Sequence, residues 1–207
     1  MDFTSIFKEF NTKKVLIIGD AMIDAYMWGT INRTSPEAPV PVVDIDKHEN
    51  RLGGAANVAL NVKALGAEPI LCAVIGDDNS GTIFTNLMQE AKLSTKGLIR
   101  SVGRKTTIKT RVIANNKHQL RIDDEDTYSI KKEADFLTTV ESLMNDVSVI
   151  ILQDYNKGVL TSKVIERVIS LANTKGIPTI VDPKKLNFTA YKNCTIFKPN
   201  LSEIKEG

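Results

Sequence analysis

The feature that most constrains this fold is a series of short apolar runs without strict alternation of polar and apolar residues. The runs are "KVLIIGD", "PILCAVIG", "VSVIILQD", "IPTIVD" and "TIFKPN", each bounded by turn-forming residues. Such runs are typical of strands buried on both faces of a parallel sheet. Between them, residues 54–65, 80–92 and 161–175 carry apolar residues at helical spacing. This alternation predicts a layered α/β/α domain with a mainly parallel central sheet.

Two regions break that rhythm. Residues 40–48 and 105–123 alternate polar and apolar side chains, and the second region reads as two strands around the turn "NNKH". We expect antiparallel ribbons that form a small β subdomain, with segments near 25–50 and 100–124. The N-terminal Phe3, Phe7 and Phe10 have helical spacing, which predicts a short packing helix.

Composition narrows the class of protein. With 207 residues, of which 42% are hydrophobic, the chain has enough apolar surface for the core of one domain. A net charge of +2 without long blocks of one sign favours a small-molecule partner over nucleic acid. No apolar window approaches the roughly 20 residues that cross a bilayer, so we expect no membrane anchor. Cys72 lies in an apolar run far from Cys194, which favours reduced thiols and a cytoplasmic location.

Polar residues follow the ends of the predicted strands: Asp20, Asp24, Asp77, Asp154, Asp182 and Asn200. In open parallel sheets the carboxyl ends of the strands form the ligand crevice. Together these residues predict a polar cleft. For any one of them, the alternative is that it begins a turn or caps a helix.

The stretch "RLGGAANVALNVKALG", residues 51–66, opens a helix with small residues. It lacks the glycine spacing of a dinucleotide fingerprint and the Lys-Ser/Thr of a Walker loop. Small residues let a ligand approach the backbone, and Asn57 can donate and accept hydrogen bonds at once, which suits a polyhydroxylated ligand. Tight packing of the helix on the sheet is the alternative.

The run "GGAANVALNVKALGAEPILCAVIG", Gly53 to Gly76, resembles the first signature of the ribokinase-like (PfkB) sugar kinases. "GDAMID", "RTSPEAPVPVV", "DYNKGVL", "DPK" and "KPNLSE" further resemble the D-glycero-D-manno-heptose-7-phosphate kinase branch. The resemblance extends from about Lys14 to Glu203. It implies a ribokinase-like domain with a small β lid.

The resemblance also implies roles for individual residues. Asp24, Gly53, Gly54 and Asn57 match the positions that bind sugar hydroxyls in the family. The run "NLSE", comprising Asn200, Leu201, Ser202 and Glu203, matches a motif that lies beside ATP and helps to organise its Mg²⁺. ATP and Mg²⁺ are therefore the expected cofactors. The alternative for "NLSE" is a helix capping box.

Three basic residues alternate on the predicted lid strands. Lys109, Arg111 and Arg121 can project to one face at period two, and a sugar that already carries a phosphate needs a cationic receptor. A solvated strand face is the alternative. Because exposed apolar strands are usually covered, we also expect a homodimer through the lid strands, as is common in the family.

Family members carry a further G-A-G-D loop that supplies the catalytic base and an anion hole, and these 207 residues do not contain it. Neither Asp154 nor Asp182 matches the base. We therefore interpret residues 1–207 as the N-terminal part of one kinase domain, truncated and inactive by itself. The parent activity expected is ATP-dependent phosphorylation of the anomeric hydroxyl of D-glycero-D-manno-heptose 7-phosphate to the 1,7-bisphosphate, for ADP-heptose and lipopolysaccharide core synthesis. Another PfkB-family sugar kinase and a non-catalytic sugar-phosphate-binding module are the alternatives.

Overall fold

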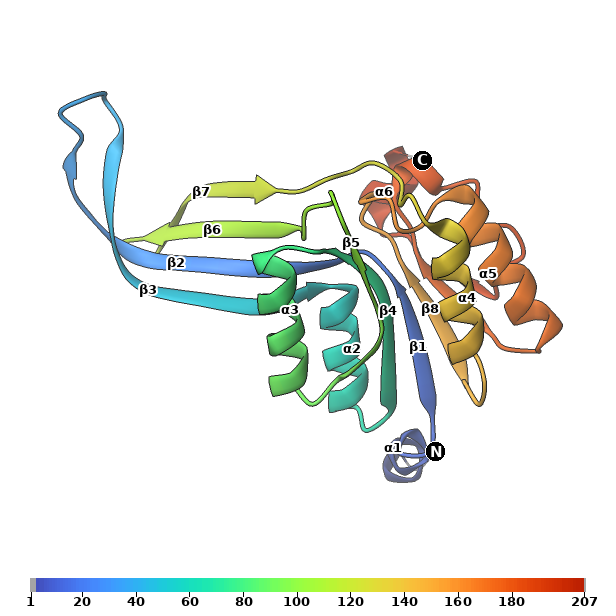
Figure 1. Cartoon of the computed structure of the whole chain (residues 1–207). Coiled ribbons are helices and arrows are strands. Elements are labelled where there is room, and N and C mark those ends of the chain that lie inside the picture. Colours follow the sequence, from blue (N-terminus) through green and yellow to red (C-terminus); the bar gives the residue numbers. More distant parts are fainter. Residues whose placement is uncertain (1–2, 207) are drawn as a thin grey trace.

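A six-stranded parallel sheet forms the centre of the structure, a computed structural model that describes residues 3–206. The strand order is β10-β9-β8-β1-β4-β5, and Figure 1 labels β8, β1, β4 and β5 of this sheet. Leu16, Ile17 and Ile18 of the central strand have no exposed surface, because helices cover both faces of the sheet. The predicted parallel sheet is confirmed. Its strands are β1 (Lys14–Gly19), β4 (Glu68–Gly76), β5 (Ser94–Ser101), β8 (Val149–Gln153), β9 (Thr179–Asp182) and β10 (Ile196–Phe197).

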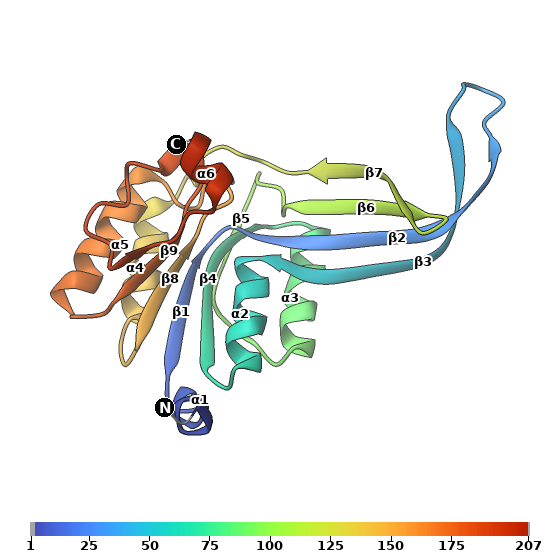
Figure 2. The ribbon, with the colours of Figure 1, turned by 180° about the vertical axis from the view of Figure 1, so that it is seen from behind.

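Helices lie on both faces of this sheet (Figures 1 and 2). Helices α2 (Ala55–Ala64) and α3 (Asn79–Glu90) cover one face, and α4 (Glu133–Leu143) and α5 (Ser162–Thr174) cover the other. The three predicted helices are α2, α3 and α5. A short 3-10 helix, η1 (Lys185–Asn187), and α6 (Leu201–Glu206) follow. None of the helices within residues 3–206 has the length and apolar character that a membrane crossing requires.

The sequence pattern missed one helix and one strand of this domain. Helix α4 fully buries only Phe136 and Val140, which is a weak periodic signal. Strand β5 has the polar sequence "STKGLIRS" and pairs only with β4, so it is a half-exposed edge. Short or edge elements need few apolar residues, and periodicity alone does not find them.

A second sheet, which we call the lid, projects from the carboxyl ends of the central strands (Figure 1). It consists of β2 (Ala21–Thr34), β3 (Pro41–Gly54), β6 (Ile108–Ala114) and β7 (Lys117–Asp124), in the order β3-β2-β6-β7. The two antiparallel ribbons are confirmed, and a parallel pairing of β2 with β6 joins them. Asn115 and Asn116 both have positive φ, as a two-residue hairpin turn requires. Strand β2 was not predicted as a separate strand, because "AMIDAYMW" is apolar at most positions and shows no clear alternation of polar and apolar residues.

The N-terminal helix α1 (Phe3–Phe10) is present, but it packs only in part. None of its residues is fully buried, and Phe3 and Phe7 are 69% and 51% exposed, whereas Ile6 and Phe10 are partly buried. The helix lies beyond the amino end of β1 (Figure 2).

The two cysteines are free thiols, as expected. Cys72 lies in the core, where burial raises its pKa to about 12, whereas Cys194 is partly exposed. A thiol with so high a pKa is an inert packing group.

Candidate functional site

The strand order of the central sheet reverses between β1 and β8, and such a switch point is where open α/β sheets bind ligands. Asp20 follows β1, and residues 154–159, which we call the switch-point loop, follow β8. The Asp20 carboxylate accepts hydrogen bonds from the backbone N–H groups of Tyr155 (2.9 Å), Lys157 (3.1 Å) and Val159 (3.1 Å). Burial raises the pKa of Asp20, and these donors oppose that rise. Asp20 therefore holds the loop in place.

Asp154 has a similar structural role. Its carboxylate accepts hydrogen bonds from Asn187 Nδ2 (3.0 Å), the Tyr191 hydroxyl (2.8 Å) and the backbone N–H of Asn156 (2.8 Å). Burial, followed by the charge of Asp154, raises the pKa of Tyr191. For Asp20 and Asp154 the turn-forming alternative is therefore correct. Asp77 lies apart on the surface, 3.7 Å from Arg100 Nη1.

The two glycines at the β3–α2 junction are required by packing. A Cβ atom at Gly53 would lie 2.4 Å from Asp24 Oδ2, so the glycine makes room for that carboxylate. Gly54 has φ +58°, and a Cβ atom there would lie 2.4 Å from the backbone oxygen of Asp20. Close packing thus accounts for both glycines, and their predicted contact with a sugar stays a prediction. This packing also fixes Asp24 at the base of the lid, beside the start of α2.

Asn57 lies in the first turn of α2 and is exposed. No side-chain hydrogen bond holds its amide within residues 3–206, and the helix begins without a side-chain cap. The Asn57 amide is therefore available to a polar ligand, and its contact with a sugar stays a prediction.

Asp24 is paired with Arg111, and the Nη1–Oδ1 distance is 2.6 Å. Both side chains are about one quarter exposed, at 23% and 24%. The hydrogen bond to Asp24 raises the pKa of Arg111. Two residues predicted to contact substrate thus contact each other.

The basic residues of the lid share one face, as predicted, since Arg111 lies opposite Arg121 and Lys109 is two residues from Arg111. Their role in binding a sugar phosphate stays a prediction, and in the structure each of them already has a carboxylate partner. Lys109 Nζ lies 2.8 Å from Asp123 Oδ2, and Arg121 Nε lies 2.9 Å from Asp123 Oδ1. The acidic run "DDED" directly after Ile122 supplies these partners, and this signal was visible in the sequence.

An aromatic ladder continues outward along the same face of the lid. Tyr26 stacks on Trp28 with ring centroids 5.8 Å apart, and Arg51 and Arg111 lie over the Tyr26 ring at 4.9 Å and 5.4 Å. Trp28 Nε1 is enclosed without a hydrogen-bond partner in residues 3–206. This face of the lid therefore carries basic and aromatic side chains that contact one another.

The "NLSE" run forms the capping box that was its alternative reading. The Asn200 backbone N–H donates to Glu203 Oε2 (2.7 Å), and the Glu203 N–H donates to Asn200 Oδ1 (2.9 Å). Lys184 Nζ donates to the other oxygen of Glu203. Burial acts to raise the pKa of Glu203, but Lys184 and the Asn200 N–H outweigh it and lower the pKa. Leu201 and Ser202 are exposed on α6.

The Tyr155 hydroxyl is close enough to both Asp24, at the lid base, and Asp182, beside the "NLSE" run, for their charges to act on it. Burial raises the pKa of its hydroxyl, and the charges of Asp182 and Asp24 raise it further. Asp182 lies on the "NLSE" side, where it accepts hydrogen bonds from Gln153 Nε2 (2.6 Å) and Lys198 Nζ (3.0 Å). The lid base and the ends of β9 and β10 therefore flank one region above the sheet.

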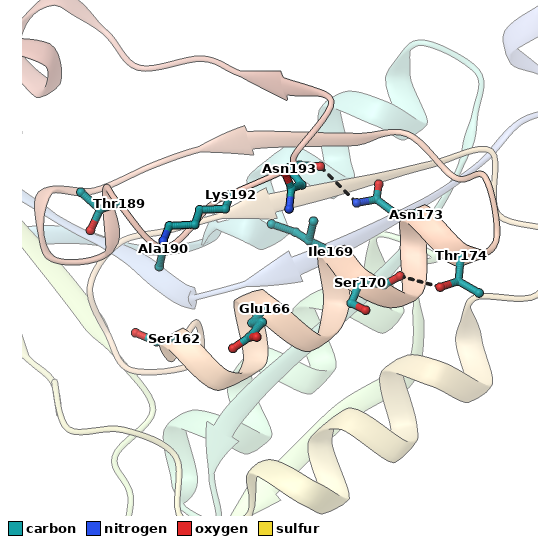
Figure 3. A pocket seen from close by; sticks show the side chains of 10 residues that line it. All are labelled: Ser162, Glu166, Ile169, Ser170, Asn173, Thr174, Thr189, Ala190, Lys192 and Asn193. Carbon is teal, nitrogen blue, oxygen red and sulfur yellow. Dashed lines mark hydrogen bonds between the residues drawn. The ribbon is translucent and has the colours of Figure 1, made fainter.

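A broad groove lies elsewhere, between α5 and residues 189–193 (Figure 3). Glu166 and Lys192 line it, and Asn173 Nδ2 donates to the backbone oxygen of Asn193 (3.2 Å). It contains none of the residues at the switch point. Within residues 3–206, no group of three or more His, Cys, Asp or Glu side chains gathers as a metal site.

Comparison with known proteins identifies the family. The model of the pfkB family carbohydrate kinases matches residues 12–206. The chain belongs to the pfkB family of carbohydrate kinases. The bifunctional protein HldE of Caulobacter sp. (strain K31) is 42% identical over 202 residues, which is 96% of this chain and 41% of the relative. HldE of Campylobacter jejuni subsp. doylei is 44% identical over 193 residues, 93% of this chain and 41% of the relative.

Solved structures of pfkB-like kinases share the fold. The tetrameric inhibited form of phosphofructokinase-2 from Escherichia coli has a TM-score of 0.71 at 15% identity, over 94% of this chain and 63% of that one. Ribokinase of Arabidopsis thaliana, solved with ribose and ATP, has a TM-score of 0.66 at 15% identity, over 94% and 62%. The ribokinase-like fold expected from the sequence is confirmed. The chain spans about two fifths of the curated relatives and about three fifths of these kinases.

Proposed function

We propose that this chain carries the sugar-binding half of a kinase for D-glycero-D-manno-heptose 7-phosphate. The kinase transfers a phosphoryl group from ATP to the anomeric hydroxyl and yields the 1,7-bisphosphate, a step towards ADP-heptose and lipopolysaccharide core. Membership of the pfkB family, HldE relatives at about 40% identity and the branch motifs "SPEAPVPVV" and "DYNKGVL" support this proposal.

The observation that carries the proposal is the position of Asp24. Gly53 makes room for its carboxylate at the base of the lid, and Asn57 is exposed in the first turn of the helix that follows Gly54. A carboxylate accepts hydrogen bonds from sugar hydroxyls, and an amide both donates and accepts. The hydrogen bond from Arg111 orients the Asp24 carboxylate for this task.

Binding of ATP and Mg²⁺ is assigned to the "NLSE" side of the cleft. The residue types suit Mg²⁺, which prefers oxygen ligands and retains several waters. The oxygens of Asp182, Glu203 and Asn200 already accept hydrogen bonds within the chain, so these residues would hold the ion through its waters. Bound MgATP would supply the phosphoryl group and neutralise its charge. Lys184, which pairs with Glu203, would keep that carboxylate ionised beside the nucleotide.

We also propose a cytoplasmic enzyme that dimerises through its lid strands. Val40 and Ile45 on the outer part of the β2–β3 hairpin are 52% and 37% exposed, and apolar strand surfaces of this kind are usually covered. Sedimentation of the chain tests the dimer, since Val40→Asp and Ile45→Asp should yield monomers.

Without a G-A-G-D loop, residues 1–207 lack the expected base, so we propose that they bind sugar phosphate without turnover. An ADP-release assay with the Caulobacter HldE relative as positive control tests this. Turnover near the control's would contradict inactivity and would require a base among Asp20, Asp154 and Asp182.

Calorimetric titration separates the substrates: heptose 7-phosphate should bind more tightly than fructose 6-phosphate or ribose. A preference for either of those would favour another pfkB sugar kinase.

The second candidate is a non-catalytic sugar-phosphate-binding module. The ion pairs of Lys109, Arg111 and Arg121 favour it, because each of these cations already has a carboxylate partner within the lid. Tight sugar binding without any ATP binding would support this alternative.

A further inference from the structure

The backbone of Lys157 is fixed from both sides by buried charges. Its N–H donates to Asp20 Oδ2 (3.1 Å), and its carbonyl oxygen accepts a hydrogen bond from Arg104 Nη2. Asp20 is 1% exposed and Arg104 is 7% exposed. Arg104 Nη1 also donates to the carbonyl oxygen of Tyr128 (2.9 Å), which lies where the chain returns from the lid. Because burying a charged group is costly, this arrangement indicates that the position of Lys157 matters.

The ammonium group of Lys157 reaches the base of the lid. Lys157 Nζ lies 2.6 Å from Glu125 Oε1, and Lys109 Nζ lies 3.0 Å from Glu125 Oε2. The three side chains are only 15–18% exposed. Lys109 is also the register partner of Asp24 on the neighbouring strand. The Lys109–Glu125–Lys157 cluster therefore borders the proposed sugar site.

Glu125 bridges two ammonium groups, and Asp123 is a second partner of Lys109 at 2.8 Å, so carboxylates of the chain itself occupy what has the arrangement of an oxyanion receptor. A phosphate monoester carries about −1.5 to −2 charge and three acceptor oxygens at neutral pH, so it competes well against the Glu125 carboxylate while Asp123 stays paired with Lys109. The other lid cations are less suitable. Arg111 is held by Asp24, and the Arg121 side chain is 58% exposed.

We propose that Lys157 and Lys109 bind the phosphate group carried by the sugar, and that Glu125 is their internal counter-ion, which this phosphate displaces. The inference rests on the proposed function and adds Lys157 as a determinant of specificity. Glu125 directly follows the last residue of β7, so its side chain can turn towards solvent when released. Sugar phosphate then replaces the ion pair that joins the switch-point loop to the lid.

Calorimetric titration of the chain with heptose 7-phosphate and with unphosphorylated heptose tests the proposal. Lys157→Met should weaken binding of the phosphorylated sugar about 10-fold or more and leave binding of the plain sugar unchanged. The reason is that Lys157 makes its charge-assisted hydrogen bond only to a sugar that carries a phosphate. Lys157→Arg should restore most of the affinity, which guards against a folding defect. Glu125→Gln should tighten binding of the phosphorylated sugar. Lys163→Met, on the outer surface of α5, is the matched control and should change neither titration.

Equal losses for both sugars, or no loss, in Lys157→Met would overturn the receptor, as would weaker phosphate binding in Glu125→Gln. A titration with ATP separates the two phosphate sources. If Lys157→Met weakens ATP binding and spares the sugar phosphate, the assignment to the sugar is wrong. Suppose that fructose 6-phosphate binds with the same dependence on Lys157, and that heptose 7-phosphate does not bind. The proposed substrate is then wrong, whereas the role of Lys157 in binding the phosphate is supported. If neither sugar phosphate binds in a Lys157-dependent way, the receptor fails.

Discussion

The central sheet and the cleft side of the lid are held in place by different forces. In the sheet, Leu16 and Ile150 are completely buried, and apolar contacts fix the strands. The first residues of the lid share this kind of packing through the buried Ile23, but the cleft side of the lid base is held by ion pairs, among them Asp24–Arg111 and Glu125–Lys157. A charged ligand can exchange with an ion pair but not with an apolar core. We therefore place the substrate at the lid base, and the central sheet serves as its rigid support.

The largest effect should come from the core. Phe136→Ala removes a fully buried ring on α4 and should lower the free energy of unfolding by about 3–5 kcal/mol. Leu120→Ala on the lid, where the side chain is 57% exposed, should change it by less than about 0.5 kcal/mol. Urea unfolding followed by circular dichroism measures both. Similar losses in the two variants would mean that the lid shares in the core and would remove the contrast.

Next in size should be the loss of the sugar contact. Asp24→Ala should weaken heptose 7-phosphate binding about 10-fold or more, since an unpaired partner in a desolvated cleft costs about 1–3 kcal/mol. ATP binding should be nearly unchanged. Asp77→Ala removes another carboxylate that follows a strand and is the matched control. Titration with each ligand separately decides, and an unchanged sugar affinity in Asp24→Ala would remove Asp24 from the site.

Arg111 offers a sharper version of the same test. Because its guanidinium is engaged by Asp24, Arg111→Ala should weaken phosphorylated and unphosphorylated heptose to the same extent, by about 3–10-fold. A loss confined to the phosphorylated sugar would instead make Arg111 the phosphate receptor, as the sequence first suggested, and would count against Lys157.

Acid should loosen the lid before the sheet. The hydrogen bond to Lys109 lowers the pKa of Asp123, and for Glu125 the bonds to Lys157 and Lys109 outweigh the opposing effect of burial and lower its pKa below 4.5. Carboxyl groups with lowered pKa stabilise the fold above their unfolded pKa values, and this contribution is lost as the pH falls through the folded values. Trp28 is the one tryptophan and lies in the lid, so its fluorescence should change below about pH 4.5 while circular dichroism is still constant. Coincident transitions would contradict this.

The smallest effect should come from salt. Exposed lid pairs such as Lys105–Asp124 contribute little to stability, and about 1 M salt screens charges beyond roughly 3 Å. Trp28 emission should shift slightly in that salt, whereas the urea midpoint followed by circular dichroism should not fall. A fall in that midpoint would show that ion pairs also hold the central sheet.

The same contrast decides which parts of the structure the sequence could predict. Strands β1 and β4 were predictable because burial on both faces requires continuous apolar runs. Asp20 and Asp24 both follow β1, and no local pattern reveals that the first holds a loop while the second stays at the cleft. The pairing of Lys157 with Glu125, 32 residues apart, arises only because the chain returns from the lid beside the switch point.

Hydrogen exchange of the chain with and without heptose 7-phosphate tests the central claim most directly. The sugar phosphate should protect the backbone amides of residues 105–126 and 154–158, because it would bind between the lid base and the switch-point loop. Residues 189–193, which line the groove along α5, should exchange unchanged (Figure 3). Protection confined to that groove, or no protection at the lid base, would contradict the account.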